Sequence, residues 1–252
     1  MNFPIYIEIG GTKFLLHAVA EILAFFIGFR YFLRLKKVQG DTIQTKNRIW
    51  IIVGAAVGSF IGSRLIGGLE DPEQIFKADN IALYFYQNKT VLGGFFGGVL
   101  GVELIKKIIH EKQASGDLFV YPIILALIIG RVGCFSMGIY EETYGTATSL
   151  PWGMDLGDGY LRHSVTLYEI VFLFLLWYFL SLAKKRFALK QGSLFKLFMI
   201  SYFLFRFLLD FIKPHYTFGI GLSTIQITAV VGLLYYIPFL IQPKKLLKPA
   251  YA

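Results

Sequence analysis

The sequence predicts an all-α integral membrane protein with seven transmembrane helices, its N-terminus outside and its C-terminus in the cytoplasm. Of the 252 residues, 56% are hydrophobic and 16% are charged, and the mean hydropathy is +0.60. A soluble domain carries about 45–50% apolar and about 25% charged residues. A soluble fold of this length could not bury so much apolar surface, so the composition excludes an ordinary soluble protein and argues against disorder.

Seven stretches of the chain are long and apolar enough to cross a bilayer. A transmembrane helix needs about 20 mostly apolar residues. In chain order, the stretches that meet this requirement are Lys13–Leu33, Ile49–Leu69, Thr90–Ile109, Phe119–Ile139, Val165–Leu182, Leu194–Ile212 and Ile220–Gln242.

The charges of the connecting loops predict the orientation. Lys and Arg gather after the first, third, fifth and seventh spans, as in the Lys184-Lys185-Arg186 run, whereas the second and fourth loops are richer in Asp and Glu. By the positive-inside rule, the basic loops face the cytoplasm. The net charge of +9 is therefore attributed to membrane topology, and no nucleic-acid partner is expected.

The chain is expected to form a single polytopic domain over residues 1–252, with an ordered outward-facing loop at about 140–164. The first span contains His17 and Glu21 and lacks a small-residue cleavage site, so it is not interpreted as a signal peptide. The long loop is rich in turn-forming residues and carries Trp152, which suits an ordered segment at the membrane surface.

Several ionisable residues lie inside the predicted spans, where a charge costs a few kcal/mol. Arg131 follows a long apolar run near the outward end of the fourth span, and its guanidinium could bind a phosphate through two hydrogen bonds or cap backbone carbonyls. The pairs His17–Glu21 and Arg206–Asp210 are spaced i,i+4, so each pair shares one helix face. Local ion pairing is the alternative to a functional role for both.

Glycines are concentrated in two spans. Gly54, Gly58 and Gly62 repeat every four residues in the second span, and five glycines lie within Gly93–Gly101 in the third. Small residues at this period let helices approach closely. Packing is the first interpretation of both runs, and a backbone opening for a lipid is the alternative for the second.

Metal and disulfide chemistry are not expected. The chain has one cysteine, Cys134, and four histidines without metal-ligand spacing. A single cysteine excludes an internal disulfide and a cysteine-cluster metal site.

Four motifs together resemble one family. The motifs are Gly130-Arg131-Val132-Gly133-Cys134-Phe135, Arg162-His163 followed by Leu167-Tyr168-Glu169, Gly93-Gly94 with Gly97-Gly98, and Arg206-Phe207 with Asp210-Phe211. In their order along the chain, beginning with the glycine pairs at 93–98, they resemble the signatures of the prolipoprotein diacylglyceryl transferases, over nearly the whole chain.

The resemblance implies a phospholipid-dependent transferase of the bacterial inner membrane. That family moves the diacylglyceryl group of phosphatidylglycerol to the lipobox cysteine thiol of a prolipoprotein, whose signal peptide would be the second partner. No metal or soluble cofactor is implied. By resemblance, Arg131 and Arg206 are the clamp for the phosphate, and Glu142 occupies an acidic position three residues before Gly145. The substrate-binding residues so implied are Gly93, Gly94, Gly97, Gly98, Gly145, His163, Tyr168, Glu169 and Asp210.

The chain departs from the family pattern at several positions, and about three extra residues appear before Gly145. Phe96 stands where the family commonly has His, and Cys134 stands where it has Asn. His17 and Glu21 could supply a substitute base, because a His beside a carboxylate accepts a proton near neutral pH. A structural hydrogen bond is the alternative. The alternative function is a divergent paralogue that binds lipid, assembles with membrane partners or uses another acceptor, and a transporter ranks third.

Overall fold

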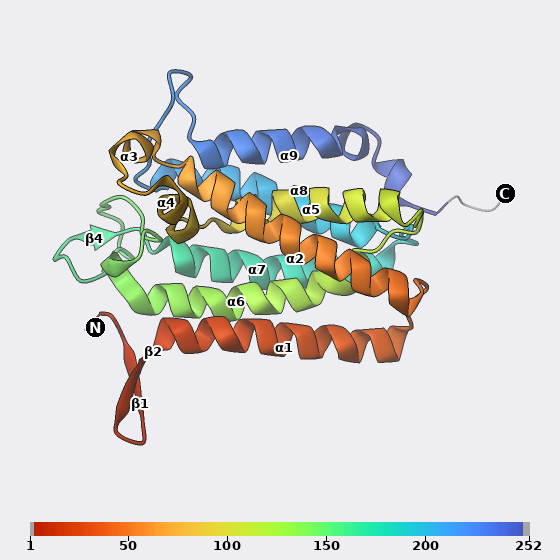
Figure 1. Cartoon of the computed structure of the whole chain (residues 1–252), viewed down its shortest axis with the longest axis horizontal. Helices are drawn as coiled ribbons and strands as arrows, with labels where there is room; N and C mark the ends of the chain where they lie inside the picture. Colours follow the sequence, from red (N-terminus) through yellow and green to blue (C-terminus); the bar gives the residue numbers. More distant parts are fainter. Residues whose placement is uncertain (1–2, 249–252) are drawn as a thin grey trace. The chain divides into compact units, whose positions relative to one another are not determined.

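The computed structural model describes residues 3–248, which fold into nine α-helices, four 3-10 turns and two small hairpins (Figure 1). The α-helices are α1 Leu16–Gln39, α2 Thr45–Gly68, α3 Pro72–Lys77, α4 Ile81–Gln87, α5 Val91–Ile108, α6 Val120–Met137, α7 Val165–Arg186, α8 Ser193–Leu209 and α9 Thr224–Ile241. The 3-10 turns are η1 Asp117–Phe119, η2 Gly138–Tyr140, η3 Asp210–Ile212 and η4 Pro243–Leu246, and the strands are β1 Tyr6–Ile9, β2 Thr12–Leu15, β3 Met154–Asp155 and β4 Leu161–Arg162.

Each of the seven predicted spans coincides with a helix. Within residues 3–248, five helical segments are long and apolar enough to cross a membrane, namely α1, α2, η1–α6–η2, α7 and α9. The other two helices in predicted spans are α5, which has three charged side chains in its C-terminal half, and α8, which has 17 residues. The predicted class, an all-α membrane protein, is confirmed at this level. The two hairpins are additions that the sequence did not predict.

The helices continue beyond the predicted spans at their basic ends. α1 reaches Gln39 and α7 reaches Arg186, with lysines or arginines in each last turn. Lys and Arg are good helix formers, and their charges suit the negative end of the helix dipole. The hydrophobic stretch therefore underestimates the length of the helix.

The chain divides into two compact units, each discontinuous in sequence. Unit 1 consists of the described residues within 1–40, 116–188 and 211–214, and unit 2 of those within 41–115, 189–210 and 215–252. Unit 1 therefore contains α1, α6 and α7, and unit 2 contains α2 to α5, α8 and α9.

In unit 1, α6 packs against both α1 and α7, and the three helices run alongside one another in Figure 1. A Cβ at Gly28 of α1 would lie 3.1 Å from Ala126 Cβ of α6, so the small residues set the helix separation. Further along, the rings of Phe32 and Phe119 stack with centroids 4.2 Å apart. The ring of Trp177 in α7 contacts the rings of Tyr31 in α1 and Tyr121 in α6, so aromatic side chains join all three helices.

A short hairpin precedes α1. β1 and β2 pair antiparallel, and Gly10 and Gly11 between them both have positive φ, which glycine adopts without strain. The amide of Ile5 donates to the carbonyl of Ser136 at 2.8 Å, and this bond ties the hairpin to the end of α6. The start of α1 is thereby fixed beside the segment that follows α6.

In unit 2, α2 and α5 cross at glycine-to-glycine contacts. A Cβ at Gly58 would lie 2.3 Å from the carbonyl oxygen of Gly97, and one at Gly97 would lie 2.2 Å from that of Gly58. The same close approach joins Gly62 to Gly93. The two glycine runs therefore pack against each other, as the four-residue spacing predicted.

The other long helices of unit 2, α8 and α9, are also in contact. The ring of Phe203 covers Gly232, where a Cβ would lie 2.6 Å from the ring edge. α9 begins with a capping box, in which the Ser223 hydroxyl accepts from the Gln226 amide and the Gln226 side chain accepts from the Ser223 amide. This cap fixes the start of α9 beside the end of α8.

Candidate active site

The site in unit 1 is built around a buried ion pair. Arg131 of α6 and Glu169 of α7 are both buried, and Arg131 Nε lies 2.9 Å from Glu169 Oε2. A buried charge of either sign is costly without its partner, so the pair fixes the guanidinium between the two helices. Both residues were singled out from the sequence, and the structure brings them together.

A second cluster adjoins the guanidinium. Arg131 Nη1 lies 3.6 Å from the sulfur of Cys134, whose thiol lies 3.6 Å from Glu141 Oε1. The other Glu141 oxygen lies 3.2 Å from His17 Nδ1. The donor atoms of His17, Cys134 and Glu141 all lie within 4.8 Å of one another. The cluster therefore joins α1, α6 and the turn that follows α6.

The turn after α6 determines which acidic residue reaches the cluster. Gly138 has φ +58, and a Cβ there would lie 2.3 Å from the carbonyl of Leu156. Only glycine fits both requirements. The chain then passes through η2, which leaves Glu141 half-buried at the cluster and Glu142 exposed. Glu142 was the predicted acidic residue, and Glu141 was overlooked. The two residues are adjacent, and the extra residues before Gly145 left undecided which of them corresponds to the acidic residue of the family.

The surroundings of Glu141 keep its carboxyl ionised. Burial alone would raise its pKa, but the hydrogen bond and charge of His17, followed by the Cys134 contact and the charge of Arg131, hold the pKa of Glu141 below its ordinary value. Glu21, the predicted partner of His17, lies farther away, with Oε2 3.9 Å from His17 Nε2. His17 therefore has a carboxylate beside each ring nitrogen.

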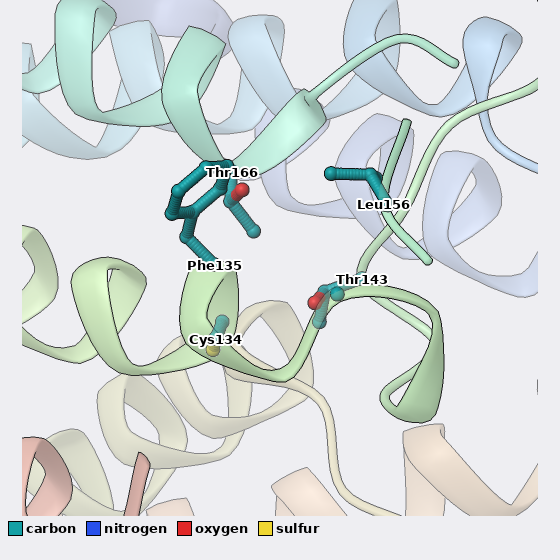
Figure 2. Close-up of a pocket in the computed structure, with 6 residues that line it drawn as sticks. Cys134, Phe135, Thr143, Leu156 and Thr166 are labelled. Atoms are coloured by element: carbon teal, nitrogen blue, oxygen red, sulfur yellow. The ribbon is translucent and has the colours of Figure 1, made fainter. Parts of the chain in front are cut away.

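Cys134 also lines a small recess at the end of α6. Figure 2 shows Cys134 and Phe135 on α6, Thr143 on the following segment, Leu156 after β3 and Thr166 at the start of α7. Gly138 completes the lining. The Cys134 thiol therefore faces apolar side chains together with the hydroxyl-bearing side chains of Thr143 and Thr166.

The segment 140–164 is tied to the first turn of α7. The Gly145 amide donates to the His163 carbonyl at 2.9 Å, and a Cβ at Gly145 would lie 2.5 Å from His163 Cβ, so a larger residue would not fit. His163 Nδ1 and Trp152 Nε1 lie 3.1 and 3.0 Å from the Tyr168 hydroxyl. Three predicted site residues, Gly145, His163 and Tyr168, thus share one hydrogen-bonded network.

A salt bridge stabilises the hairpin formed by β3 and β4. Arg162 Nε donates to Asp158 Oδ2 at 2.8 Å, and this hydrogen bond lowers the pKa of the Asp158 carboxyl. Asp155 accepts from the amides of Gly157 and Gly159, which lower its pKa in the same way. The hairpin therefore closes through charged hydrogen bonds in addition to its short ladder.

In unit 2, the predicted pair Arg206 and Asp210 is buried, but the carboxylate has partners that the sequence did not reveal. α8 ends at Leu209, and Asp210 begins the 3-10 turn η3. The Ser223 hydroxyl donates to Asp210 Oδ2, and His215 Nδ1 lies 3.7 Å from the same oxygen. Asp210 thereby links the end of α8 to the cap of α9.

The four predicted glycines of α5 differ in what surrounds them. At Gly93 and Gly97, residues of α2 occupy the space that a side chain would need. A Cβ at Gly98 would meet the Ser59 hydroxyl at 2.5 Å, whereas at Gly94 the nearest atom would be 3.7 Å away. Packing against α2 accounts for three of them, and a substrate-binding role for the four stays a prediction.

Comparison with known proteins identifies the family. The family model of prolipoprotein diacylglyceryl transferase matches residues 4–242. Relatives named phosphatidylglycerol--prolipoprotein diacylglyceryl transferase include one from Nitratidesulfovibrio vulgaris strain DP4, 30% identical over 230 residues, covering 83% of this chain and 81% of the relative. Another, from Campylobacter hominis, is 27% identical over 250 residues, covering 88% and 85%. The chain belongs to the prolipoprotein diacylglyceryl transferase family.

Proposed function

We propose that this chain transfers the diacylglyceryl group of phosphatidylglycerol to the lipobox cysteine of prolipoproteins in the inner membrane of a bacterium. The match to the family along almost the whole chain supports the reaction. The arrangement that carries the proposal within the molecule is the buried Arg131–Glu169 pair, whose guanidinium contacts Cys134 at the lining of a small recess. A cation held in this way suits the phosphate of the lipid donor.

The reaction requires a cation where negative charge develops. The acceptor sulfur forms a bond to a glycerol carbon of the lipid while that carbon's bond to the phosphate oxygen breaks, and glycerol phosphate leaves. A guanidinium positioned at the departing phosphate stabilises this charge without reorganisation. Glu169 holds the Nε edge of Arg131, and Nη1 points toward the Cys134 side, where we place the phosphate. Arg206 of unit 2 is assigned the same chemical role by resemblance.

The acceptor thiol must also lose its proton. His17 and Glu141 are the titratable groups that meet beside Cys134, in place of the His17–Glu21 pair expected from the sequence. Their position at the end of α6 supports thiol activation close to the guanidinium that we assign to the phosphate. Thiolate is the nucleophilic form of cysteine, so this proximity favours sulfur attack.

The topology completes the proposal. We infer seven transmembrane helices, with α5 and α8 as the spans that add to the five most apolar ones, and an N-terminus outside. The basic residues at the ends of α1, α5 and α7 would then face the cytoplasm. The segment 140–164 and the cluster would lie at the outer surface, where a prolipoprotein signal peptide presents its lipobox.

The test uses the full chain in phosphatidylglycerol nanodiscs with a lipobox peptide, and mass spectrometry detects diacylglyceryl on the peptide cysteine. We expect Arg131→Lys to lower the rate about 100-fold, because the charge stays but the fixed guanidinium fork is lost. Arg30→Lys is the matched control, because Arg30 lies in a helix of the same unit and is exposed.

Two outcomes would contradict the proposal. Full activity of Arg131→Ala would exclude the phosphate role of this arginine. Absence of product from the unchanged chain, while an authentic transferase works under the same conditions, would instead support a paralogue that binds lipid or uses another acceptor.

A further inference from the structure

The cluster of His17, Cys134 and Glu141 has a composition that the proposed reaction alone does not require. It combines an imidazole, a thiol and a carboxylate, and their donor atoms converge within 4.8 Å. All three residues are half-buried. Imidazole nitrogen, cysteine sulfur and carboxylate oxygen are the three donor types that zinc uses in proteins.

We propose that His17, Cys134 and Glu141 bind a zinc ion. Zinc bond lengths of about 2.0–2.1 Å to N and O and about 2.3 Å to S, in a tetrahedral site, separate an N···O pair by about 3.3 Å and an S···O pair by about 3.5 Å. The observed His17 Nδ1 to Glu141 Oε2 distance is 3.2 Å, and the Cys134 Sγ to Glu141 Oε1 distance is 3.6 Å. The two contacts use different oxygens of Glu141, so a single zinc ion requires a rotation of that carboxylate. With one donor atom taken from each residue, all three lie within 4.8 Å of one another, and this convergence is what the proposal rests on. The expectation of no metal, drawn from the single cysteine and the histidine spacing, considered each residue type alone.

The groups around the cluster suit a bound cation. A neutral imidazole, a thiolate and a carboxylate balance the two positive charges of zinc, so the site adds no net charge beside the neutral Arg131–Glu169 pair. Arg131 Nη1, 3.6 Å from Cys134 Sγ, is placed to donate to a metal-bound thiolate. Glu21 Oε2 lies 3.9 Å from the other nitrogen of His17. Outer carboxylates of this kind orient the ligating imidazole and raise its basicity.

Three protein ligands leave one position of a tetrahedral zinc for a further ligand. This part of the inference rests on the proposed function, because it assigns that position to the acceptor thiol. The thiol would bind as thiolate and release its proton to water, and the metal-bound sulfur would then form the thioether as glycerol phosphate leaves. A coordinating thiol is deprotonated by the metal itself, so with zinc bound His17 and Glu141 would contribute to thiol activation as metal ligands and not as the proton acceptor.

Metal binding is tested without any substrate. The full chain is stripped with a chelator in detergent, reloaded with Zn²⁺ and analysed by mass spectrometry of metals, and a parallel sample takes Co²⁺, whose thiolate charge-transfer absorption requires a cysteine ligand. We expect roughly one zinc per chain. Cys134→Ser should abolish the charge-transfer band and weaken zinc binding at least tenfold, and Glu21→Gln should weaken it about 10- to 100-fold.

Glu142→Gln is the matched control, because it changes the adjacent exposed carboxylate and should leave zinc binding unchanged. Circular dichroism of each variant without metal separates loss of binding from loss of folding. The site is refuted if the folded unchanged chain binds no zinc, or if Cys134→Ser binds it as tightly as the unchanged chain.

The role of the open position has its own readout. A lipobox peptide added to the cobalt-loaded chain should intensify the thiolate band, and a peptide with serine in place of its cysteine should not. This result does not depend on lipid transfer, so it holds even if the chain uses a different lipid donor. An unchanged spectrum with a bound lipobox peptide would overturn the assignment of the acceptor thiol to zinc.

Discussion

Replacing Gly97 by alanine would place a methyl group where α2 already lies. The new Cβ would be 2.2 Å from the carbonyl oxygen of Gly58 and 2.8 Å from the Cα of Gly62. Both atoms belong to the backbone, so no side chain can rotate away. Real Cβ contacts essentially never fall below 3.0 Å, so α2 and α5 would have to separate by about 0.8 Å at this level.

The expected cost follows from two opposing effects. Overpacking in a well-packed interior costs about 1–3 kcal/mol. Because the new methyl group would contact backbone atoms, which cannot move aside, we take the upper end, about 3 kcal/mol. Alanine in place of glycine inside a helix returns about 1 kcal/mol. The free energy of unfolding should therefore fall by about 2 kcal/mol, which is roughly a 30-fold change in the folding equilibrium. At Gly94 the nearest atom would be 3.7 Å from the new Cβ, so alanine there should stabilise.

The assay is SDS-induced unfolding of the full chain in mixed micelles, followed by tryptophan fluorescence. Gly97→Ala should unfold at lower SDS fraction than the unchanged chain, and Gly94→Ala at an equal or higher one. The reasoning is wrong if both variants shift in the same direction. Unchanged stability of Gly97→Ala together with loss of lipid binding would instead support the interpretation of the glycine run as an opening for lipid.

Three further predictions concern single interactions. Glu169→Gln removes the charge that neutralises buried Arg131 and should lower the free energy of unfolding by about 3 kcal/mol in the same assay; an unchanged midpoint would exclude the pair as a structural anchor. Ser223→Ala removes a helix cap and a donor to a buried carboxylate and should cost about 2–3 kcal/mol; Ser223→Thr, which keeps the hydroxyl, should recover most of it. Because Arg162 lowers the pKa of Asp158, their contribution to hairpin stability should persist at neutral pH and disappear as the pH falls through the lowered value; hydrogen exchange of residues 154–162 should show this acid limit, and Asp158→Asn should remove it.

The long helices could be predicted because their apolar stretches are unambiguous at this length. The short elements could not, since α3 and α4 have six and seven residues, too few to display a hydrophobic period. A local signal was nevertheless present. Asp71 caps α3 with a proline directly after it, and Asn80 caps α4, and both patterns mark helix starts.

Most residues of the candidate site, Glu141 excepted, could be singled out from the sequence, but their pairing could not. The cost of a charge in the bilayer singled out Arg131 and Glu169 separately. Their contact joins two helices, and the sequence carries no signal for it. The i,i+4 spacing of Arg206 and Asp210 predicted a shared face, and the Asp210 amide still donates to the Arg206 carbonyl at the end of α8. The bond that the Asp210 carboxylate accepts from Ser223 reaches another helix, and helix periodicity predicts only neighbours within one helix.

The discontinuity of unit 1 has a consequence for biogenesis. α1 reaches the membrane early, but α6, against which Gly28 packs, and Phe119 directly before it, which stacks on Phe32, follow only after roughly 80 residues. Synthesis of these residues takes about 4–16 s. The glycine faces of α2 and α5 are complete once Gly101 has been synthesised, before α6 begins at Val120. We expect α1 of a ribosome-arrested chain ending after α5 to cross-link to the insertion machinery, and to lose that cross-link once α6 has entered the membrane.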